Sequence, residues 1–296
     1  MANKYRYSEI FRSIQGEGYY TGRPTVWYRA WGCNFECLGF GSKNPKNVDR
    51  EKLPMSTIDA TQYDRVEDLP VFNLGCDSSY SWSKKFSHLA KHETAEEIVT
   101  RLENLLPDQK FGDYWHMAFT GGEPMLSQTA IVDIMWTFVD HLNVPKNITF
   151  ETNGSRMPRE PFIDMFGYTD ETGKHFTPKL NGVNLFWSCS PKLSASGEDW
   201  DRAIKPQVLQ EYNRISTHGQ LKYVVDGTYD VWKEVEEATR QYRAVGVNWP
   251  IYIMPVGATV EEQEEVQKEI CLQTLDRGYN FSPRVHCWIF GNEIGT

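Results

Sequence analysis

The sequence alternates between strand patterns and helix patterns along most of its length, and this feature limits its fold more than any other. Strand patterns rich in β-branched and aromatic residues occupy residues 25–30, 114–120, 147–152, 184–190, 220–225 and 250–255. Amphipathic helix patterns cover residues 94–106, 129–142, 229–245 and 259–275. Strand followed by helix, repeated, predicts a largely parallel sheet, curved or closed, with helices outside and functional loops at the carboxyl ends of the strands.

The start of the first helix is marked by its own residues. Thr94 is a good N-cap, and Glu97 stands at the third helical position, so that the two predict a capping box.

Composition excludes several classes of protein. The chain has 296 residues and a formal net charge of -9, which argues against broad attraction to nucleic acid or to anionic membranes. No apolar run reaches the roughly 20 residues that cross a bilayer, and the start lacks the apolar stretch of a secretory signal. We therefore expect a cytoplasmic protein whose residues 1–296 form a single domain.

Three of the six cysteines stand in polar or Gly-rich surroundings that suit metal binding. Cys33 and Cys37 are separated by three residues, but two thiolates cannot complete a zinc or iron site. Cys76, in the short segment "GCDSSYSW", is the natural third ligand. Three thiolates on a four-iron cluster leave one iron open to a small molecule, an arrangement typical of radical chemistry with S-adenosylmethionine. Cys189, Cys271 and Cys287 lie in apolar or amphipathic surroundings and are expected to pack as small hydrophobes.

Longer motifs make this interpretation specific. The opening "SEIFRSIQGEGYYTGRPTVWYRAWGCNFEC" resembles that of 7-carboxy-7-deazaguanine synthases, and the likeness continues through "CDSSYSW", "FTGGEPML", "ETNG", "SPK", "LKYVV", "IMPVG" and "RVHCWIFGNEIGT". One feature departs from the family, whose usual spacing is Cys-x3-Cys-x2-Cys. Here residues 38–75 separate the second and third cysteines. Such a length is tolerable because each doubling of a loop adds only about 0.6 kcal/mol of closure free energy.

The resemblance implies a fold and a reaction. The fold is a modified, partial (β/α) barrel of the radical S-adenosylmethionine type, with 38–75 as an insertion between the second and third cluster cysteines. Cys33, Cys37 and Cys76 would hold a 4Fe-4S cluster on which S-adenosylmethionine is cleaved. The radical so formed would take hydrogen from C6 of 6-carboxy-5,6,7,8-tetrahydropterin, and a ring contraction assisted by Mg²⁺ would give 7-carboxy-7-deazaguanine and ammonia. This makes the chain a lyase of queuosine-type 7-deazaguanine biosynthesis.

The resemblance also assigns the cofactor residues. The residues for S-adenosylmethionine are Cys76, Asp77, Gly122, Ser190, Pro191 and Lys192. Gly121 and Gly122 have a physical reason as well, since glycines let a backbone approach a ligand closely. Ser78 would supply a hydroxyl oxygen to Mg²⁺, where the family has Thr or Ser.

For the substrate the family pattern gives a second set of residues, namely Ile14, Gln15, Gly16, Arg29, Thr120 and Thr296. Arg29 would pair with the substrate carboxylate through its planar fork, although a salt bridge at the strand end is the alternative. The terminal carboxylate at Thr296 would accept N–H donors from the pterin. We expect residues 284–290, which are largely apolar, to form a final strand that docks in the sheet and holds this end.

Two alternatives stay open from sequence alone. One is a glycyl-radical-activating enzyme, which should lack "IQGEG", and the other is a non-enzymatic module with a structural zinc site. The resemblance further implies an electron donor of the flavodoxin or ferredoxin type and a homodimer. For residues 38–75 we slightly favour a tolerated elaboration over a contact with a partner or reductase.

Overall fold

The structure is a computed structural model that describes residues 2–296. Its strands are β1 (Lys4–Ile14), β2 (Pro24–Ala30), β3 (Lys91–Thr94), β4 (His116–Gly121), β5 (Asn147–Thr152), β6 (Tyr168–Thr169), β7 (His175–Phe176), β8 (Asn184–Cys189), β9 (Gly219–Val225), β10 (Ile251–Pro255) and β11 (Asn280–Phe281). Its α-helices are α1 (Pro54–Thr57), α2 (Ala95–Asn104), α3 (Gln128–Asp140), α4 (Phe162–Phe166), α5 (Trp200–Ala203), α6 (Pro206–Ile215), α7 (Tyr229–Ala244), α8 (Val260–Asp276) and α9 (Val285–Phe290). The six strands and four helices expected from the sequence are confirmed.

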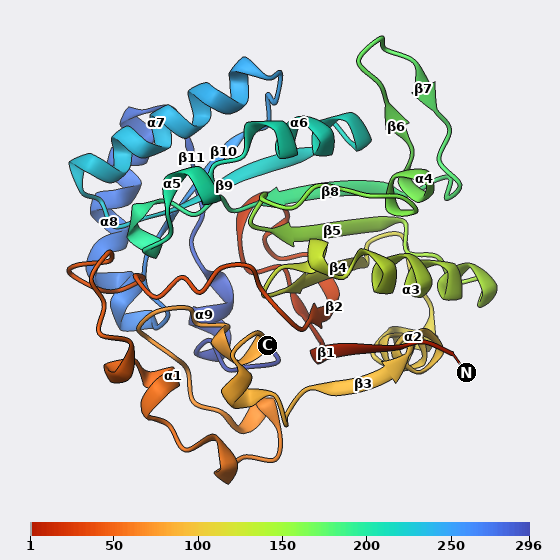
Figure 1. Cartoon of the computed structure of the whole chain (residues 1–296), viewed down its shortest axis with the longest axis horizontal. Helices are drawn as coiled ribbons and strands as arrows, with labels where there is room; N and C mark the ends of the chain where they lie inside the picture. The colour runs from red at the N-terminus through yellow and green to blue at the C-terminus, as the bar shows by residue number, and fades with distance from the viewer. Residues whose placement is uncertain (1) are drawn as a thin grey trace.

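The central sheet is largely parallel, as predicted. Within residues 2–296 it has nine strands in the order β11-β10-β9-β8-β5-β4-β2-β1-β3. All neighbours from β2 to β11 pair in parallel, whereas β1 runs antiparallel to both β2 and β3. The sheet is a partial barrel, open at β11 and β3, and Figure 1 shows its helices arranged along the outside. The carboxyl ends of the parallel strands therefore meet at one edge, where the predicted site residues lie.

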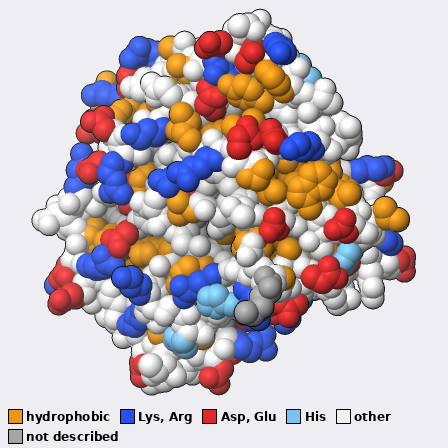
Figure 2. Space-filling view, turned by 45° about the vertical axis from the view of Figure 1, so that its right-hand side comes forward, with side chains coloured by type: hydrophobic (Ala, Val, Ile, Leu, Met, Phe, Trp, Pro, Cys, Tyr) orange, Lys and Arg blue, Asp and Glu red, His pale blue; other side chains and the backbone are white. Residues whose placement is uncertain are grey.

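The main core lies between the sheet and these helices. Trp187 of β8 is fully buried, stacks on Tyr212 of α6 at 4.2 Å between ring centroids, and donates its Nε1 hydrogen to the Tyr212 carbonyl oxygen at 2.9 Å. On the outside, acidic and basic side chains are interspersed over the face drawn in Figure 2. Among residues 2–296, no helix combines the length and the apolar character needed to span a membrane.

Residues 38–75 have an apolar cluster of their own, separate from the main core. They form α1 and the short 3-10 turns Arg50–Lys52, Ala60–Gln62 and Val66–Asp68. The buried members of the cluster are Leu53, Met55, Ala60, Val66, Leu69 and Phe72 from this segment, with Tyr80, Phe86 and Leu89 from the chain that follows. The segment therefore shares its cluster with residues 76–90, and it also contacts the barrel, since Trp31 packs on the cluster and the Gly39 N–H donates to the Ser196 carbonyl oxygen at 2.9 Å.

The strand expected over residues 284–290 is wrong, because Val285–Phe290 is helix α9. Only Cys287 in it is buried, while its neighbours Trp288 and Ile289 are 45% and 56% exposed, and two consecutive exposed residues fit one face of a helix rather than an alternating strand. Gly291 ends the helix in the left-handed region with φ 65°. The last strand of the sheet is instead β11, which pairs with β10.

The capping box at the start of α2 is present as predicted. The Glu97 backbone N–H donates to Thr94 Oγ1 at 3.3 Å, and the Thr94 backbone N–H donates to Glu97 Oε2 at 2.8 Å. Replacement of Thr94 by Ala should lower the free energy of unfolding by about 1 kcal/mol, as measured by urea denaturation. Thr100→Ala, at an exposed position inside the same helix, is the matched control and should cost less. Equal losses in the two variants would contradict a stabilising cap.

Candidate functional site

A cavity of about 500 Å³ opens at the carboxyl ends of the parallel strands. Its walls come from the residues after β2, β4, β5, β8 and β10, from residues 38–75, and from the chain after β11. Among the residues predicted for the site, those lining the cavity are Ile14, Gln15, Gly16, Arg29, Cys33, Cys37, Cys76, Asp77, Ser78, Thr120, Gly122, Ser190, Lys192 and Thr296. Pro191 is the exception, since it is buried and does not line the cavity.

The three predicted cysteines all reach this cavity despite their separation in sequence. Cys33 and Cys37 follow β2, and Cys76 follows the 38–75 segment, yet all three belong to one small packed group with Phe35, Phe40 and Ala203. The Phe35 backbone N–H donates to Cys33 Sγ and the Trp82 indole N–H donates to Cys76 Sγ, each at 3.4 Å. Donors to sulfur are one of the means by which a protein stabilises cluster thiolates and sets their reduction potential.

The apolar surroundings keep these thiols protonated when no metal is bound. Burial raises the pKa of Cys33 to about 12 and that of Cys76 to about 11, and it raises the pKa of Cys37 well above its ordinary value. A nucleophilic cysteine requires the opposite shift. A metal deprotonates a coordinating thiol outright, so these residues suit ligation better than nucleophilic catalysis.

The loop after β4 packs directly on the first of these cysteines. A Cβ atom added at Gly122 would lie 2.6 Å from the Cβ of Cys33, and Gly121 has φ 144°. The two glycines are therefore required by the chain's own packing, in addition to any ligand. Glu123, which the sequence analysis did not select, is fully buried and accepts hydrogen bonds from Thr152 Oγ1 and the Asn153 N–H, both at 2.7 Å. It thus ties the loop after β4 to the loop after β5.

Arg29 reaches the cavity with part of its guanidinium already paired. Its Nε donates to Glu9 of β1, which also accepts from the Tyr80 hydroxyl at 2.9 Å. Arg29 Nη1 lies 3.5 Å from Ser78 Oγ, and Ser78 Oγ donates to Asp77 Oδ1 at 3.1 Å. Arg29 therefore forms, with Glu9, the salt bridge at the strand end that the sequence left open as an alternative to substrate binding. This bridge holds the outer part of the Arg29 guanidinium beside Ser78.

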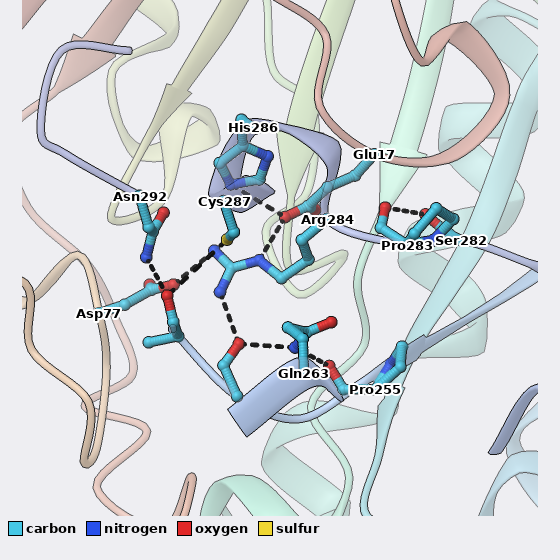
Figure 3. Close-up of polar contacts among 12 residues, drawn as sticks. Glu17, Asp77, Pro255, Gln263, Ser282, Pro283, Arg284, His286, Cys287 and Asn292 are labelled. Atoms are coloured by element: carbon cyan, nitrogen blue, oxygen red, sulfur yellow. Dashed lines mark hydrogen bonds and ion pairs between the residues drawn. The ribbon is translucent and has the colours of Figure 1, made fainter. Parts of the chain in front are cut away.

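The same cavity is lined by a buried network of charges that the sequence analysis missed. Lys222 Nζ of β9 donates to Glu17 at 2.5 Å and to Glu151 at 3.1 Å. On the other side of Glu17, Arg284 Nε lies 3.0 Å from its carboxylate, and Arg284 Nη2 lies 2.9 Å from Asp77 Oδ2. Figure 3 shows Arg284 between these two acids, with His286 beside Glu17. One signal was available in the sequence, namely a lysine inside the apolar strand pattern "LKYVV".

The neighbours of each ionisable group in this network determine whether that group is charged at neutral pH. Burial alone would raise the pKa of Glu17, but the positive charges of Lys222 and Arg284 outweigh it and hold that pKa well below its ordinary value. Burial alone would lower the pKa of Lys222, but the negative charges of Glu151 and Glu17 outweigh it and raise that pKa. Burial lowers the pKa of His286 to about 4. At neutral pH the network therefore contains ionised carboxylates, a charged lysine and arginine, and a neutral histidine.

Known proteins match this chain along nearly its whole length. The crystal structure of QueE from Escherichia coli superposes with a TM-score of 0.53 at 17% identity, covering 96% of this chain and 95% of that one. The 7-carboxy-7-deazaguanine synthase of Pyrobaculum aerophilum is 26% identical over 98% of this chain and 96% of its own length. Those of Rhodopirellula baltica and Halobacterium salinarum are each 25% identical over 98% of this chain, and this covers 88% and 91% of their lengths. No family model matches the chain.

The fold is that of the QueE structure, and at the carboxyl ends of its strands it brings three thiols to one cavity. The relatives that the chain resembles over 98% of its length are 7-carboxy-7-deazaguanine synthases.

The lysine between two carboxylates gives a first test of the site. Lys222→Met would leave Glu17 and Glu151 buried with one positive charge fewer, and should lower the free energy of unfolding by about 3 kcal/mol or more in urea denaturation. Lys233→Met removes an exposed pair with Asp230 (3.6 Å) and is the matched control, expected to cost less than about 1 kcal/mol. A loss at Lys222 no larger than that at Lys233 would contradict the network.

The lowered pKa of Glu17 predicts a pH dependence. A carboxyl group whose folded pKa lies below its unfolded value adds stability above the unfolded pKa, and this stability is lost as pH falls through the folded pKa. The free energy of unfolding should therefore fall more steeply between about pH 5 and about pH 3 in the parent than in Glu17→Gln. Asp77 is present in both proteins, so its carboxyl group titrates in both curves. Parallel pH curves would show that Glu17 has an ordinary pKa.

Proposed function

We propose that the chain is a 7-carboxy-7-deazaguanine synthase, which converts 6-carboxy-5,6,7,8-tetrahydropterin into 7-carboxy-7-deazaguanine and ammonia. The observation that carries the proposal is the meeting of three thiols at one cavity, although residues 38–75 separate two of them from the third. The proposal is supported by three 7-carboxy-7-deazaguanine synthases, each of which matches 98% of the length of this chain.

The thiol group fits an iron-sulfur cofactor. Cys33, Cys37 and Cys76 would each ligate a different iron of a 4Fe-4S cluster, and the two N–H donors to sulfur and the apolar surroundings suit that role. When bound, such a cluster supplies the electron that cleaves S-adenosylmethionine reductively and so starts radical chemistry. The protein's part is to exclude water and to hold the reactants in place.

For S-adenosylmethionine we propose Gly122, Asp77, Ser190, Pro191 and Lys192. Gly122 lies against Cys33, and Lys192 Nζ donates to Ser190 Oγ at 3.2 Å, close enough to the thiols for its charge to act on their pKa. Pro191 does not reach the cavity, and its role would be to fix the backbone between its two neighbours.

The substrate would lie between the thiols and the charge network. Ile14, Gln15 and Gly16 offer backbone and amide groups on one side, with Thr120 on another. Gln15 is held by donation of Nε2 to Glu151 at 2.8 Å. Arg29 keeps guanidinium hydrogens for the substrate carboxylate beyond the one given to Glu9. Thr296 lines the same cavity and would add a contact near the pterin.

Ser78 is our proposed ligand for Mg²⁺. Its hydroxyl is a hard oxygen, and the Asp77 carboxylate at 3.1 Å adds negative charge beside it. Mg²⁺ commonly keeps water and substrate oxygens among its ligands, so one protein oxygen suffices. An ion there would compensate the charge of a substrate carboxylate paired with Arg29.

The relatives' names favour this function over a glycyl-radical-activating enzyme and over a zinc module. A one-electron donor of the flavodoxin or ferredoxin type and a homodimer complete the proposal, and these two rest on the resemblance alone. A cytoplasmic location is proposed as well, as expected from the composition.

Product analysis tests the proposed function. The full chain, reconstituted anaerobically with iron and sulfide, is incubated with 6-carboxy-5,6,7,8-tetrahydropterin, S-adenosylmethionine, Mg²⁺ and a chemical reductant. Mass spectrometry should detect 7-carboxy-7-deazaguanine formed in step with substrate loss. Consumption of S-adenosylmethionine without that product, at several substrate concentrations, would reject the proposal.

Cysteine substitutions test the ligand set. Cys76→Ala should lose the bound four-iron cluster and all product formation, and Cys33→Ala and Cys37→Ala should do the same, because two thiolates cannot hold the cluster. Cys189→Ala is the control, a fully buried thiol in β8, and it should retain both iron content and activity. Iron and sulfide analysis measures the first readout. A full four-iron complement in Cys76→Ala would exclude that residue as a ligand.

A further inference from the structure

The last residues of the chain pack against the 38–75 segment. Ile294 packs on the apolar cluster that this segment shares with the chain after it, whose buried members include Leu53, Val66 and Phe72 from the segment and Tyr80, Phe86 and Leu89 from residues 76–90. The adjoining Gly295 also faces the segment, since a Cβ atom added there would lie 3.6 Å from Cγ of Glu67. Figure 1 shows the C-terminal end beside the orange and yellow parts of the chain, which carry residues 38–75 and the residues after them.

These same last residues form part of the cavity wall. Asn292, Glu293, Ile294, Gly295 and Thr296 all line the cavity. A Cβ atom added at Gly295 would lie 3.8 Å from Oε2 of Glu9, the carboxylate that Arg29 and Tyr80 bind. Two hydrogen bonds fix the turn that brings residues 292–296 there, one to the loop after β10 and one within the turn. Asn292 Nδ2 donates to the Ala258 carbonyl oxygen at 2.9 Å, and Thr296 Oγ1 donates to the Glu293 carbonyl oxygen at 2.6 Å.

Bonds within residues 285–296 alone would not keep these residues in place. Helix α9 has six residues, too few for a stable helix by itself, so its contacts with the rest of the protein hold it. These are the Val285 N–H bond to the Gly16 carbonyl oxygen at 3.0 Å, the Asn292 bond to Ala258, and the packing of Ile294.

Ile294 is the apolar side chain of residues 292–296, and it lies on the 38–75 cluster. If Cys37 and Cys76 were joined by only two residues, the members of that cluster contributed by residues 38–75 would be missing.

We infer that the 38–75 segment positions the C-terminal residues 292–296 at the substrate side of the cavity, and that Ile294 is the positioning residue that joins the two. This gives the segment a role beyond tolerated elaboration. The inference rests on the proposed function for the identity of the substrate, whereas the packing of Ile294 does not depend on it. Ile294 acts through the placement of its neighbours, so its loss should affect substrate binding and leave the thiols intact.

The test compares Ile294→Ser with Ile294→Val and Ile289→Ser in the full chain. Ile294→Ser removes the apolar contact, and Ile294→Val keeps most of it. Ile289→Ser makes the same chemical change five positions earlier, at a side chain on α9 that is 56% exposed. Three quantities are measured, namely the apparent KM for the tetrahydropterin, the cleavage of S-adenosylmethionine without substrate, and hydrogen exchange of residues 285–296 in the protein without cofactor.

We expect Ile294→Ser to raise the apparent KM about tenfold, equivalent to about 1.4 kcal/mol of lost binding. S-adenosylmethionine cleavage should stay within about twofold of the parent, and hydrogen exchange of residues 285–296 should become faster while that of α2 is unchanged. Ile294→Val should restore the parent values, and Ile289→Ser should match the parent throughout.

Two results would overturn the inference. One is an Ile294→Ser protein that matches Ile289→Ser in hydrogen exchange, and the other is faster exchange with an unchanged KM. Failure of the proposed function has a different signature, because the parent itself would then form no product. In that case the exchange comparison still decides whether the 38–75 segment holds the C-terminal residues.

Discussion

Parallel pairing of the strands is the constraint on which the site depends. From β2 through β4, β5, β8, β9 and β10 the strands run in one direction, so the residues that follow several of them meet at one edge of the sheet. Cys33 after β2, the Gly121–Gly122 turn after β4 and Ser190 after β8 are far apart in sequence and line one cavity. The register between β2 and β4 pairs Arg29 with Thr120, which puts two of the proposed substrate contacts on neighbouring strands.

The cavity has two chemically distinct sides. Thiols in apolar surroundings form one side, where burial favours neutral groups and suits a metal that displaces the protons. Paired charges form the other, where Lys222 lies between Glu17 and Glu151 and Arg284 joins Glu17 to Asp77. Buried charges of this kind persist only when they are paired and hydrogen-bonded. A ligand that spans both sides would meet polar groups held in fixed positions at one end and an apolar, thiol-lined surface at the other.

Sequence patterns predicted the elements with the strongest periodicity and the residues with distinctive motifs. Strands β2, β4, β5, β8, β9 and β10 and the capping box at Thr94 have local signals, as do the three cysteines. Strand β1 was missed because it buries Ser8 and Glu9 next to Tyr7, which breaks the alternation of apolar and polar residues. The final helix was mistaken for a strand because its apolar residues do not show which face is exposed.

The charge network could not be predicted from local signals, because its members meet only after folding. Glu17 after β1 and Arg284 after β11 each have, alone, the ordinary interpretation of a polar surface residue. Lys222 in β9 stands in an apolar pattern, which indicates burial but does not identify its partners. The contact between Ile294 and the 38–75 segment is of the same kind. Such pairs depend on the order of strands in the sheet and on the path of the segment between Cys37 and Cys76.

The central claim is that thiols separated by residues 38–75 hold one cluster with an iron open to S-adenosylmethionine. Electron paramagnetic resonance of the anaerobically reconstituted, reduced full chain tests this directly when spectra are recorded with and without S-adenosylmethionine. The account predicts about four iron atoms per chain and a reduced-cluster signal whose g-values shift when S-adenosylmethionine is added. A protein that takes up zinc in place of iron, or a cluster signal that S-adenosylmethionine leaves unchanged, would contradict it.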